Sequence, residues 1–419
     1  GMRIGWYFSP MDWRDPDCRN EHNDRFVAKM QAELRELLTH YGKIDLLWFD
    51  CDGREVPWDQ EKTYALVKKL QPEIVINNRL DMGVGSNAGS PGSIGPQADY
   101  FTPEQWIGGY EDQHPWESCM TTSRRGQWSW GGAEDGVKSH TEVMEMLIRC
   151  ASGDGNVLLN VGPTPTGEIA PEQANRLKEM GAWLAKYGES IYGTRGGPFK
   201  PGDYGATTRK GNTIYVHIRD WDDAMLKLPA IPAKVLRSRV LTGGKAEVRQ
   251  TSAGLEIVVT ESDRQPLDTV VALELDGSAL SLRAMEVPLP PSLTTKAKAT
   301  ASNVYRKQAE FGADKAVDGN RGTRWATDTG TKSAWLEMDL GKPVTFSRAV
   351  IKQAYPELKR IRKFVIEYWQ DEQWKPCYRG ESLGAKFATK FEPVTAQRVR
   401  LNITESTDGP TLWEFQLFK

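Results

Sequence analysis

The chain has 419 residues, of which 39% are hydrophobic and 26% charged, and its formal net charge at pH 7 is −2. This length predicts two or three domains, and the near-neutral charge argues against nucleic acid as a partner. The five cysteines are widely spaced with no CxxC motif, which argues against a disulfide framework or a zinc site, and no apolar run is long enough to span a membrane.

Residues 1–195 alternate short apolar runs with amphipathic stretches. Apolar residues recur at helical spacing over 23–41 and 60–70, which predicts two helices there. Strands and helices that alternate in this way indicate parallel βαβ units, and strands that are apolar throughout are typical of a sheet covered on both faces. The predicted strands are 3–9, 44–50, 73–79, 99–105 and 156–163.

The predicted strands of this region end in polar residues, among them Asp50, Arg79 and Glu104. The carboxyl ends of parallel strands form the working face of a (β/α)₈ barrel or the crevice of an open nucleotide-binding sheet. No glycine-rich phosphate loop follows a strand, so the barrel is favoured. The predicted strands are too few to close a barrel, and we therefore expect about three strands to precede residue 1.

Two carboxylates are the simplest catalytic constellation in this region. Asp50 and Glu104 both end predicted strands, so their side chains could face each other across a cleft. Hydrolysis of an acetal uses one ionised carboxyl group to attack or stabilise the anomeric carbon and one protonated group to serve the leaving oxygen. Arg79 is a natural partner that would hold one of the two ionised. From the residues alone, a helix cap or a simple ion pair remains an alternative role for either acid.

From about residue 196 the pattern changes to alternation in period two with glycine and asparagine turns, which predicts an antiparallel β-sandwich over 196–285. A proline-rich linker, 286–296, separates it from a second all-β domain over 297–419. The strands predicted in these two domains are 212–221, 236–244, 246–260, 269–277, 335–341, 347–353, 363–369, 397–403 and 412–418.

Six segments of the first region resemble α-L-fucosidases of glycoside hydrolase family 29, and most of all the branch that acts on 1,3- and 1,4-linked fucose. They are GWYFSPMDW, GKIDLLWFDCDG, INNR, DYFTPEQ, PWESCMTTSRRGQWSW and GNVLLNVGPTPTG. The resemblance covers nearly all of 1–195. It implies a retaining exo-glycosidase with a (β/α)₈-like barrel followed by a β-sandwich, acting on fucosylated oligosaccharides or glycoconjugates in the periplasm or outside the cell.

The same resemblance implies roles for individual residues. Asp50 matches the nucleophile and Glu104 the acid/base, with Glu117 of the PWES segment as the alternative. We favour Glu104 because it ends a predicted strand, whereas Glu117 is predicted to lie in a longer connection. No cofactor is implied for catalysis. The implied substrate contacts are Tyr7, Trp48, Arg79 and Trp130.

One departure from the family pattern concerns histidine. The family holds fucose hydroxyls with histidines on strands that precede the GWYFSP segment, including an adjacent pair. We therefore expect the chain to lack part of the fucose subsite, and two interpretations stay open: an active exo-α-L-fucosidase, or a catalytically impaired carbohydrate-binding protein. The histidines present, none of them in a pair, are His22, His40, His114, His140 and His217.

Residues 297–419 resemble the discoidin-like (factor V/VIII type C) fold of carbohydrate-binding module family 32. The segments that carry this resemblance are ADKAVDGNRGTRWAT, AWLEMDLGKPV and LWEFQLF. It implies a structural calcium ion in the KAVDGN turn, with side chains at Asp318, Thr323 and Glu414, and hard oxygen donors suit calcium. A plain turn at Asp318 is the alternative. Trp325 fits either a core position or a sugar platform.

Overall fold

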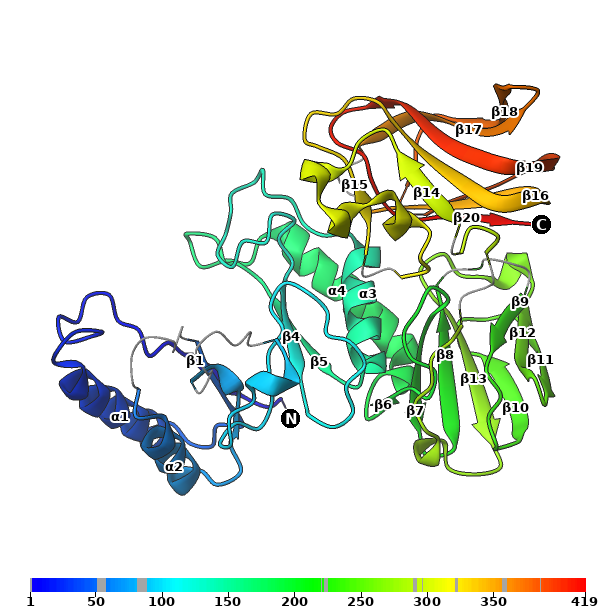
Figure 1. Cartoon of the computed structure of the whole chain (residues 1–419). Helices are drawn as coiled ribbons and strands as arrows, with labels where there is room; N and C mark the ends of the chain where they lie inside the picture. The colour runs from blue at the N-terminus through cyan, green and yellow to red at the C-terminus, as the bar shows by residue number, and fades with distance from the viewer. Residues whose placement is uncertain are drawn as a thin grey trace. The chain divides into compact units, whose positions relative to one another are not determined.

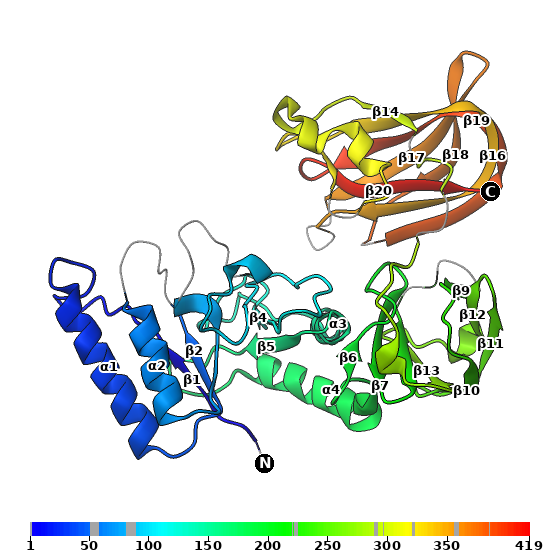
Figure 2. The same ribbon diagram turned by 60° about the horizontal axis from the view of Figure 1, so that its bottom comes forward.

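The computed structural model describes the chain except for residues 1, 51–57, 81–88, 220, 222–224, 289–291, 296, 321–322, 356–359 and 385. The chain divides into two units, Gly1–Pro288 and Leu289–Lys419, which are drawn in Figures 1 and 2. Within the described residues, no helix has the length and apolar character that a membrane crossing requires.

Parallel strands in chain order make up the first part of the first unit. The sheet β1-β2-β3 is parallel throughout, and so is the separate pair β4-β5. Single bridges at Tyr100 and Phe101 connect β3 to β4. This order is the one a (β/α) barrel requires, but the described strands do not form a closed ring, so the complete barrel stays a prediction. The strands are β1 (Gly5–Phe8), β2 (Leu46–Phe49), β3 (Val75–Ile76), β4 (Glu117–Thr121) and β5 (Asn156–Asn160).

Two helices, α1 (Asn23–His40) and α2 (Gln60–Leu70), lie side by side next to the first sheet, as both views show. Met30 and Leu34 of α1 are buried against Leu47 of β2 in one apolar cluster. The helical spacing of these apolar residues thus fixes which face of α1 packs on the sheet.

The strand β4 was not predicted, and the placement of Glu117 in a long connection is wrong. Glu117 is the first residue of β4. The segment ESCMT has neither an apolar run nor period-two alternation, because buried polar side chains interrupt it. Ser118, for example, is fully buried and donates a hydrogen bond to the Trp106 carbonyl oxygen, 3.1 Å away. Conversely, the predicted strand 99–105 pairs only through isolated bridges.

A β-sandwich completes the first unit. Its sheets have the orders β10-β13-β8-β7-β6 and β11-β12-β9. The larger sheet also packs against α3 (His140–Ser152) and α4 (Pro171–Tyr187), with Met144 and Trp183 in one cluster with Tyr215 and Val270. This shared core joins the sandwich to the parallel strands. The strands are β6 (Arg195–Gly196), β7 (Gly205–Lys210), β8 (Thr213–Ile218), β9 (Met225–Leu228), β10 (Val235–Val240), β11 (Ala246–Thr251), β12 (Gly254–Val259) and β13 (Thr269–Leu275).

The second unit is a seven-stranded antiparallel sheet system with the order β15-β20-β16-β19-β17-β18, in which β14 pairs with β16. Trp325 is fully buried, and its indole N–H donates to the Asn303 carbonyl oxygen at 3.0 Å. Trp325 is therefore a core residue, which settles the alternative left by the sequence. The strands are β14 (Lys298–Ala301), β15 (Trp325–Ala326), β16 (Ala334–Gln353), β17 (Ile361–Gln370), β18 (Gln373–Gly380), β19 (Lys386–Ser406) and β20 (Thr411–Phe418).

The packing of Trp116 against Gly155 gives a test of the parallel-strand region. A Cβ at Gly155 would lie 2.2 Å from Cε2 of Trp116, which is buried. We expect Gly155→Ala to lower the free energy of unfolding by about 1–3 kcal/mol or more, because the indole has to move. The matched control is Gly181→Ala in α4, where nothing lies within 4 Å of the added Cβ, and this change should be neutral or stabilising. Urea unfolding of both variants measures the difference, and equal stabilities would contradict this packing.

Candidate active site

Arg79 joins the two predicted catalytic carboxylates. Its Nη1 lies 3.1 Å from Oδ1 of Asp50, and its Nη2 lies 2.6 Å from Oε2 of Glu104. The Arg79 side chain is 8% exposed, whereas those of Asp50 and Glu104 are 36% and 41% exposed. A buried cation therefore holds two carboxylates that remain accessible to a substrate. Arg79 itself is fixed by Thr102, whose hydroxyl accepts a hydrogen bond from Nε at 2.9 Å.

Trp48 is the platform on which this arrangement rests. The Arg79 guanidinium lies over its ring, 4.5 Å from the centroid, and the Tyr7 ring stacks on it at 5.8 Å with an interplanar angle of 17°. The Tyr7 hydroxyl donates to Oδ2 of Asp50 at 2.6 Å. Burial, and next the hydrogen bond to Asp50, raise the pKa of Tyr7 above its ordinary value. Tyr7 therefore stays protonated at physiological pH and keeps donating to Asp50.

The strand register explains why these side chains meet. Tyr7 of β1 is paired with Trp48 of β2, so both side chains lie on the same face of the sheet. The Asn77 amide group then fixes the end of β2, because it accepts from the Phe49 N–H at 3.0 Å and donates to the Phe49 carbonyl oxygen at 2.8 Å. Asp50 follows directly, where the chain leaves the sheet, and its own N–H donates to the Phe8 carbonyl oxygen.

Glu117 occupies a different, more buried environment. Burial raises the pKa of its carboxyl group to about 7, and the adjacent Trp48 indole N–H offsets part of this effect. Burial, and next the charge of Glu117, raise the pKa of the Tyr100 hydroxyl. Among the described residues, Oε1 of Glu117 has no hydrogen-bond partner. The structure thus brings Glu104, rather than Glu117, into contact with the group that holds Asp50.

Trp130 is the predicted substrate contact that the structure does not bring to this cluster. It lies in the segment after β4, and its side chain is 38% exposed. The nearby Trp128 carbonyl oxygen accepts a hydrogen bond from Asn160 at 2.8 Å, which ties this segment to the end of β5. The contacts that hold Asp50 and Glu104 do not involve Trp130.

Thr102 and Asn78 also belong to the site, although the sequence pattern indicated Asn78 only as a polar strand end and did not indicate Thr102. The Thr102 hydroxyl, which accepts from Arg79, donates to Oδ1 of Asn78 at 3.3 Å, and Asn78 in turn donates to the Ser93 hydroxyl at 2.8 Å. Asn78 was visible in the INNR segment beside Arg79. Thr102 lies two residues before Glu104 in the predicted strand 99–105. Because residues two apart in a strand share a face, the position of Glu104 could have indicated Thr102 as a neighbour.

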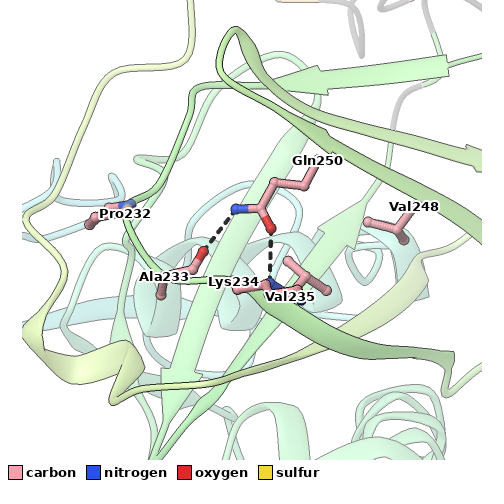
Figure 3. Close-up of a pocket in the computed structure, with 6 residues that line it drawn as sticks. All are labelled: Pro232, Ala233, Lys234, Val235, Val248 and Gln250. Atoms are coloured by element: carbon pink, nitrogen blue, oxygen red, sulfur yellow. Dashed lines mark hydrogen bonds between the residues drawn. The ribbon is translucent and has the colours of Figure 1, made fainter.

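A separate hollow of about 410 Å³ in the sandwich lacks such chemistry. Figure 3 shows that the Gln250 amide group already bonds to the backbone: it donates to the Ala233 carbonyl oxygen at 2.8 Å and accepts from the Val235 N–H at 2.9 Å. The remaining lining residues are Pro232, Lys234 and Val248. This lining contains no carboxylate. The cluster of Arg79, Asp50, Glu104 and Tyr7 is therefore the better candidate for a hydrolytic site.

The predicted calcium ligands lie together in the second unit. Oδ2 of Asp318 accepts from the Thr323 hydroxyl at 2.7 Å, and its Oδ1 accepts from the Asn320 N–H at 2.9 Å. Glu414 is 1% exposed, and burial followed by the charge of Asp318 raises its pKa to about 7. Oε1 of Glu414 has no hydrogen-bond partner among the described residues. Two neighbouring carboxylates, one with an unpartnered buried oxygen, fit a hard cation with oxygen ligands.

Comparison with known proteins relates both units to established families. Residues 1–189 match the family model described as Alpha-L-fucosidase, and residues 298–415 match that of the F5/8 type C domain. Residues 1–189 are thus similar to an α-L-fucosidase domain and are called the fucosidase domain below. The relatives include the plasma α-L-fucosidase of Homo sapiens, 31% identical over 209 residues that cover 46% of this chain and 42% of the relative.

The tissue α-L-fucosidase of Bos taurus is 29% identical over 240 residues, which cover 53% of this chain and 48% of the relative. This chain thus spans about half the length of the curated fucosidases it matches. The solved α-L-fucosidase isoenzyme 1 from Paenibacillus thiaminolyticus is 29% identical, with a TM-score of 0.57, over 66% of this chain and 72% of that chain. About two thirds of the chain therefore has a fold similar to that of this solved fucosidase.

The buried carboxyl group of Glu117 predicts a pH dependence of stability. Its pKa is about 7 in the folded state against an ordinary 4.5, so the folded state binds an extra proton between these values. The free energy of unfolding should therefore fall as pH rises through this window and level off above it. Glu117→Gln should remove this slope, which amounts to about 3 kcal/mol at most between pH 4 and pH 8.

Urea unfolding at several pH values measures this slope. Because the pKa of Glu414 is raised in the same direction, both proteins should carry Glu414→Gln, so that the remaining difference belongs to the fucosidase domain. Equal slopes with and without the Glu117 carboxyl group would contradict its burial.

Proposed function

We propose that the chain is a retaining exo-α-L-fucosidase that removes terminal α1,3- or α1,4-linked L-fucose from oligosaccharides and glycoconjugates. The observation that carries the proposal is the contact of one guanidinium, Arg79, with both Asp50 and Glu104. Retaining glycosidases use two carboxyl groups about 5–5.5 Å apart. Two carboxylates on the two arms of one guanidinium are close enough to serve the same glycosidic bond. The family match supports fucose as the sugar, and the sequence resemblance supports the linkage.

In this mechanism, Asp50 attacks the anomeric carbon while Glu104 gives a proton to the departing glycosidic oxygen. A covalent fucosyl ester on Asp50 results. Glu104 then takes a proton from water, which attacks the same carbon and releases fucose with its original configuration. Tyr7 and Arg79 each hold one oxygen of Asp50, so the attacking carboxylate is oriented before the substrate arrives.

The alternative of a catalytically impaired carbohydrate-binding protein is not favoured. Burying an arginine costs desolvation free energy unless charged groups pair with it. Arg79 is paired with two accessible carboxyl groups, and a site that had lost its function would not be expected to keep this arrangement. The Arg79 contacts and the fucosidase relatives both support an enzyme.

For the F5/8 type C domain we propose a glycan-directed role with a structural calcium ion. Asp318 and Glu414 would hold the ion with carboxylate oxygens, next to the Thr323 hydroxyl, and the ion would neutralise their mutual repulsion. We place the enzyme in the periplasm or outside the cell, because its proposed substrates are glycans of oligosaccharides and glycoconjugates.

Leaving-group dependence distinguishes the two candidate acids. Fucosyl fluoride needs little acid catalysis because fluoride departs readily, whereas a fucosyl disaccharide needs a proton donor. Glu104→Ala should therefore lower kcat for the disaccharide by about 10²–10⁴-fold and spare the fluoride far more. Azide, which can replace water as nucleophile, should accelerate this variant on the fluoride.

Glu117→Gln is the comparison for this experiment, and it should affect both substrates alike, since Glu117 neighbours Trp48 and not the two carboxyl groups proposed to react. If Glu117→Gln showed the selective loss and Glu104→Ala did not, the acid/base assignment would move to Glu117.

Removal of calcium should destabilise only the second unit. Ion binding stabilises the folded state by mass action, so EDTA should lower the Tm of one calorimetric transition and added calcium should restore it. Glu414→Gln should abolish this response. The matched control is Glu337→Gln, which removes a carboxylate paired with Arg398 on the same unit and should leave the response intact. An unchanged Tm with EDTA would contradict the proposed ion.

A further inference from the structure

An exposed tryptophan stands beside the proposed nucleophile. Trp13 lies in the segment Ser9–Arg14 that follows β1, and it is 91% exposed. This segment, together with Tyr7 and Asp50, lines a cavity of about 440 Å³. The lining residues are Tyr7, Ser9, Met11, Asp12, Trp13, Arg14 and Asp50.

The segment is held in place by its own contacts. The Arg14 N–H donates to Oδ1 of Asp12 at 2.8 Å, and the Arg19 guanidinium donates to Sδ of Met11 at 3.4 Å. Further along, Asp15 forms an ion pair with Lys29 of α1 at 2.7 Å. Because these contacts already fix the segment that carries Trp13, little conformational entropy is lost when a ligand stacks on the ring.

Trp13 offers an exposed ring in the same cavity as Asp50. An indole ring offers a large apolar face and one N–H donor, and its burial is favourable in proportion to the apolar area removed from water. Within the described part of the chain, Trp13 has no aromatic partner and its neighbour Arg14 has no ion pair. A flat apolar face flanked by a carboxylate, Asp12, and a cation, Arg14, suits a sugar ring, whose C–H face can stack while its hydroxyl groups take hydrogen bonds.

We propose that Trp13, with Asp12 and Arg14, forms a subsite for a second sugar ring of the substrate, the one linked to the fucosyl unit. The inference rests on the proposed fucosidase function, because it takes the fucosyl unit to lie on Asp50. Asp50 and Trp13 line the same cavity, so one oligosaccharide can occupy both. The enzyme would thus select fucosylated oligosaccharides over fucosides without a second ring.

The first test compares substrates with and without that ring. α-L-Fucosyl fluoride lacks a second ring, and a fucosyl-N-acetylglucosamine disaccharide has one. In Trp13→Ala, the ratio of kcat/KM for the disaccharide to that for the fluoride should fall about ten-fold, as expected for one lost stacking contact. Trp13→Phe should recover part of the ratio. Leu236→Ala, which removes an exposed apolar side chain of β10, is the control and should keep the wild-type ratio. An unchanged ratio in Trp13→Ala would overturn the subsite.

The second test does not depend on turnover. The protein is labelled with 5-fluorotryptophan, the Trp13 resonance is assigned from Trp13→Phe, and the disaccharide is titrated into the Asp50→Ala variant while ¹⁹F spectra are recorded. A saturable shift of the Trp13 resonance supports the subsite even if the chain hydrolyses neither substrate, in which case only the proposed function fails. If the wild-type chain hydrolyses the disaccharide but the Trp13 resonance does not move, the subsite is wrong and the function stands.

Discussion

The arrangement of the candidate active site depends on the contact of the Arg79 guanidinium with Asp50 and Glu104. Two carboxyl groups this close repel each other when both are ionised, and the shared, buried cation between them offsets that repulsion. The cation itself needs support in a region from which water is largely excluded. Trp48 provides it with an aromatic face, and Thr102 provides a hydrogen-bond acceptor. Removing either support would leave a buried charge with fewer partners.

The residues that contact Arg79 are themselves packed against further side chains of the sheet. Trp48 lies between the charged cluster and a second buried polar group, the carboxyl group of Glu117, whose raised pKa reflects its burial. The two glutamates thus have different environments: Glu104 faces a cation and is accessible, whereas Glu117, at the start of β4, faces an indole with its carboxyl group buried. Environment, rather than residue type, separates a reacting carboxyl group from a structural one.

Much of the site could be predicted from the sequence because it follows from strand endings. Asp50 comes directly after an apolar run that the structure shows as β2. Arg79 lies in a short 3-10 turn just after β3, and Glu104 lies in a segment that a single bridge joins to Cys119 of β4, so both come to the same edge as Asp50. Glu117 was misplaced because β4 carries buried serine and threonine residues whose hydrogen-bond partners, such as the Trp106 carbonyl oxygen, are not apparent from a local pattern. Similarly, 335–341 and 347–353 were predicted as two strands and form one strand, β16, whose pairing with β19 shifts register between them. The burial of Trp325 depends on Asn303, 22 residues earlier in the chain.

The central claim is that Asp50 and Glu104 act as a pair in a double displacement. Proton NMR of the reaction mixture, recorded within the first minutes of hydrolysis of an α-L-fucoside, shows which anomer of fucose is released before mutarotation mixes the two. A nucleophile and an acid/base held together by Arg79 predict that α-L-fucose appears first. Initial release of β-L-fucose would mean a single displacement by water, which needs a wider carboxylate separation, and would contradict the account.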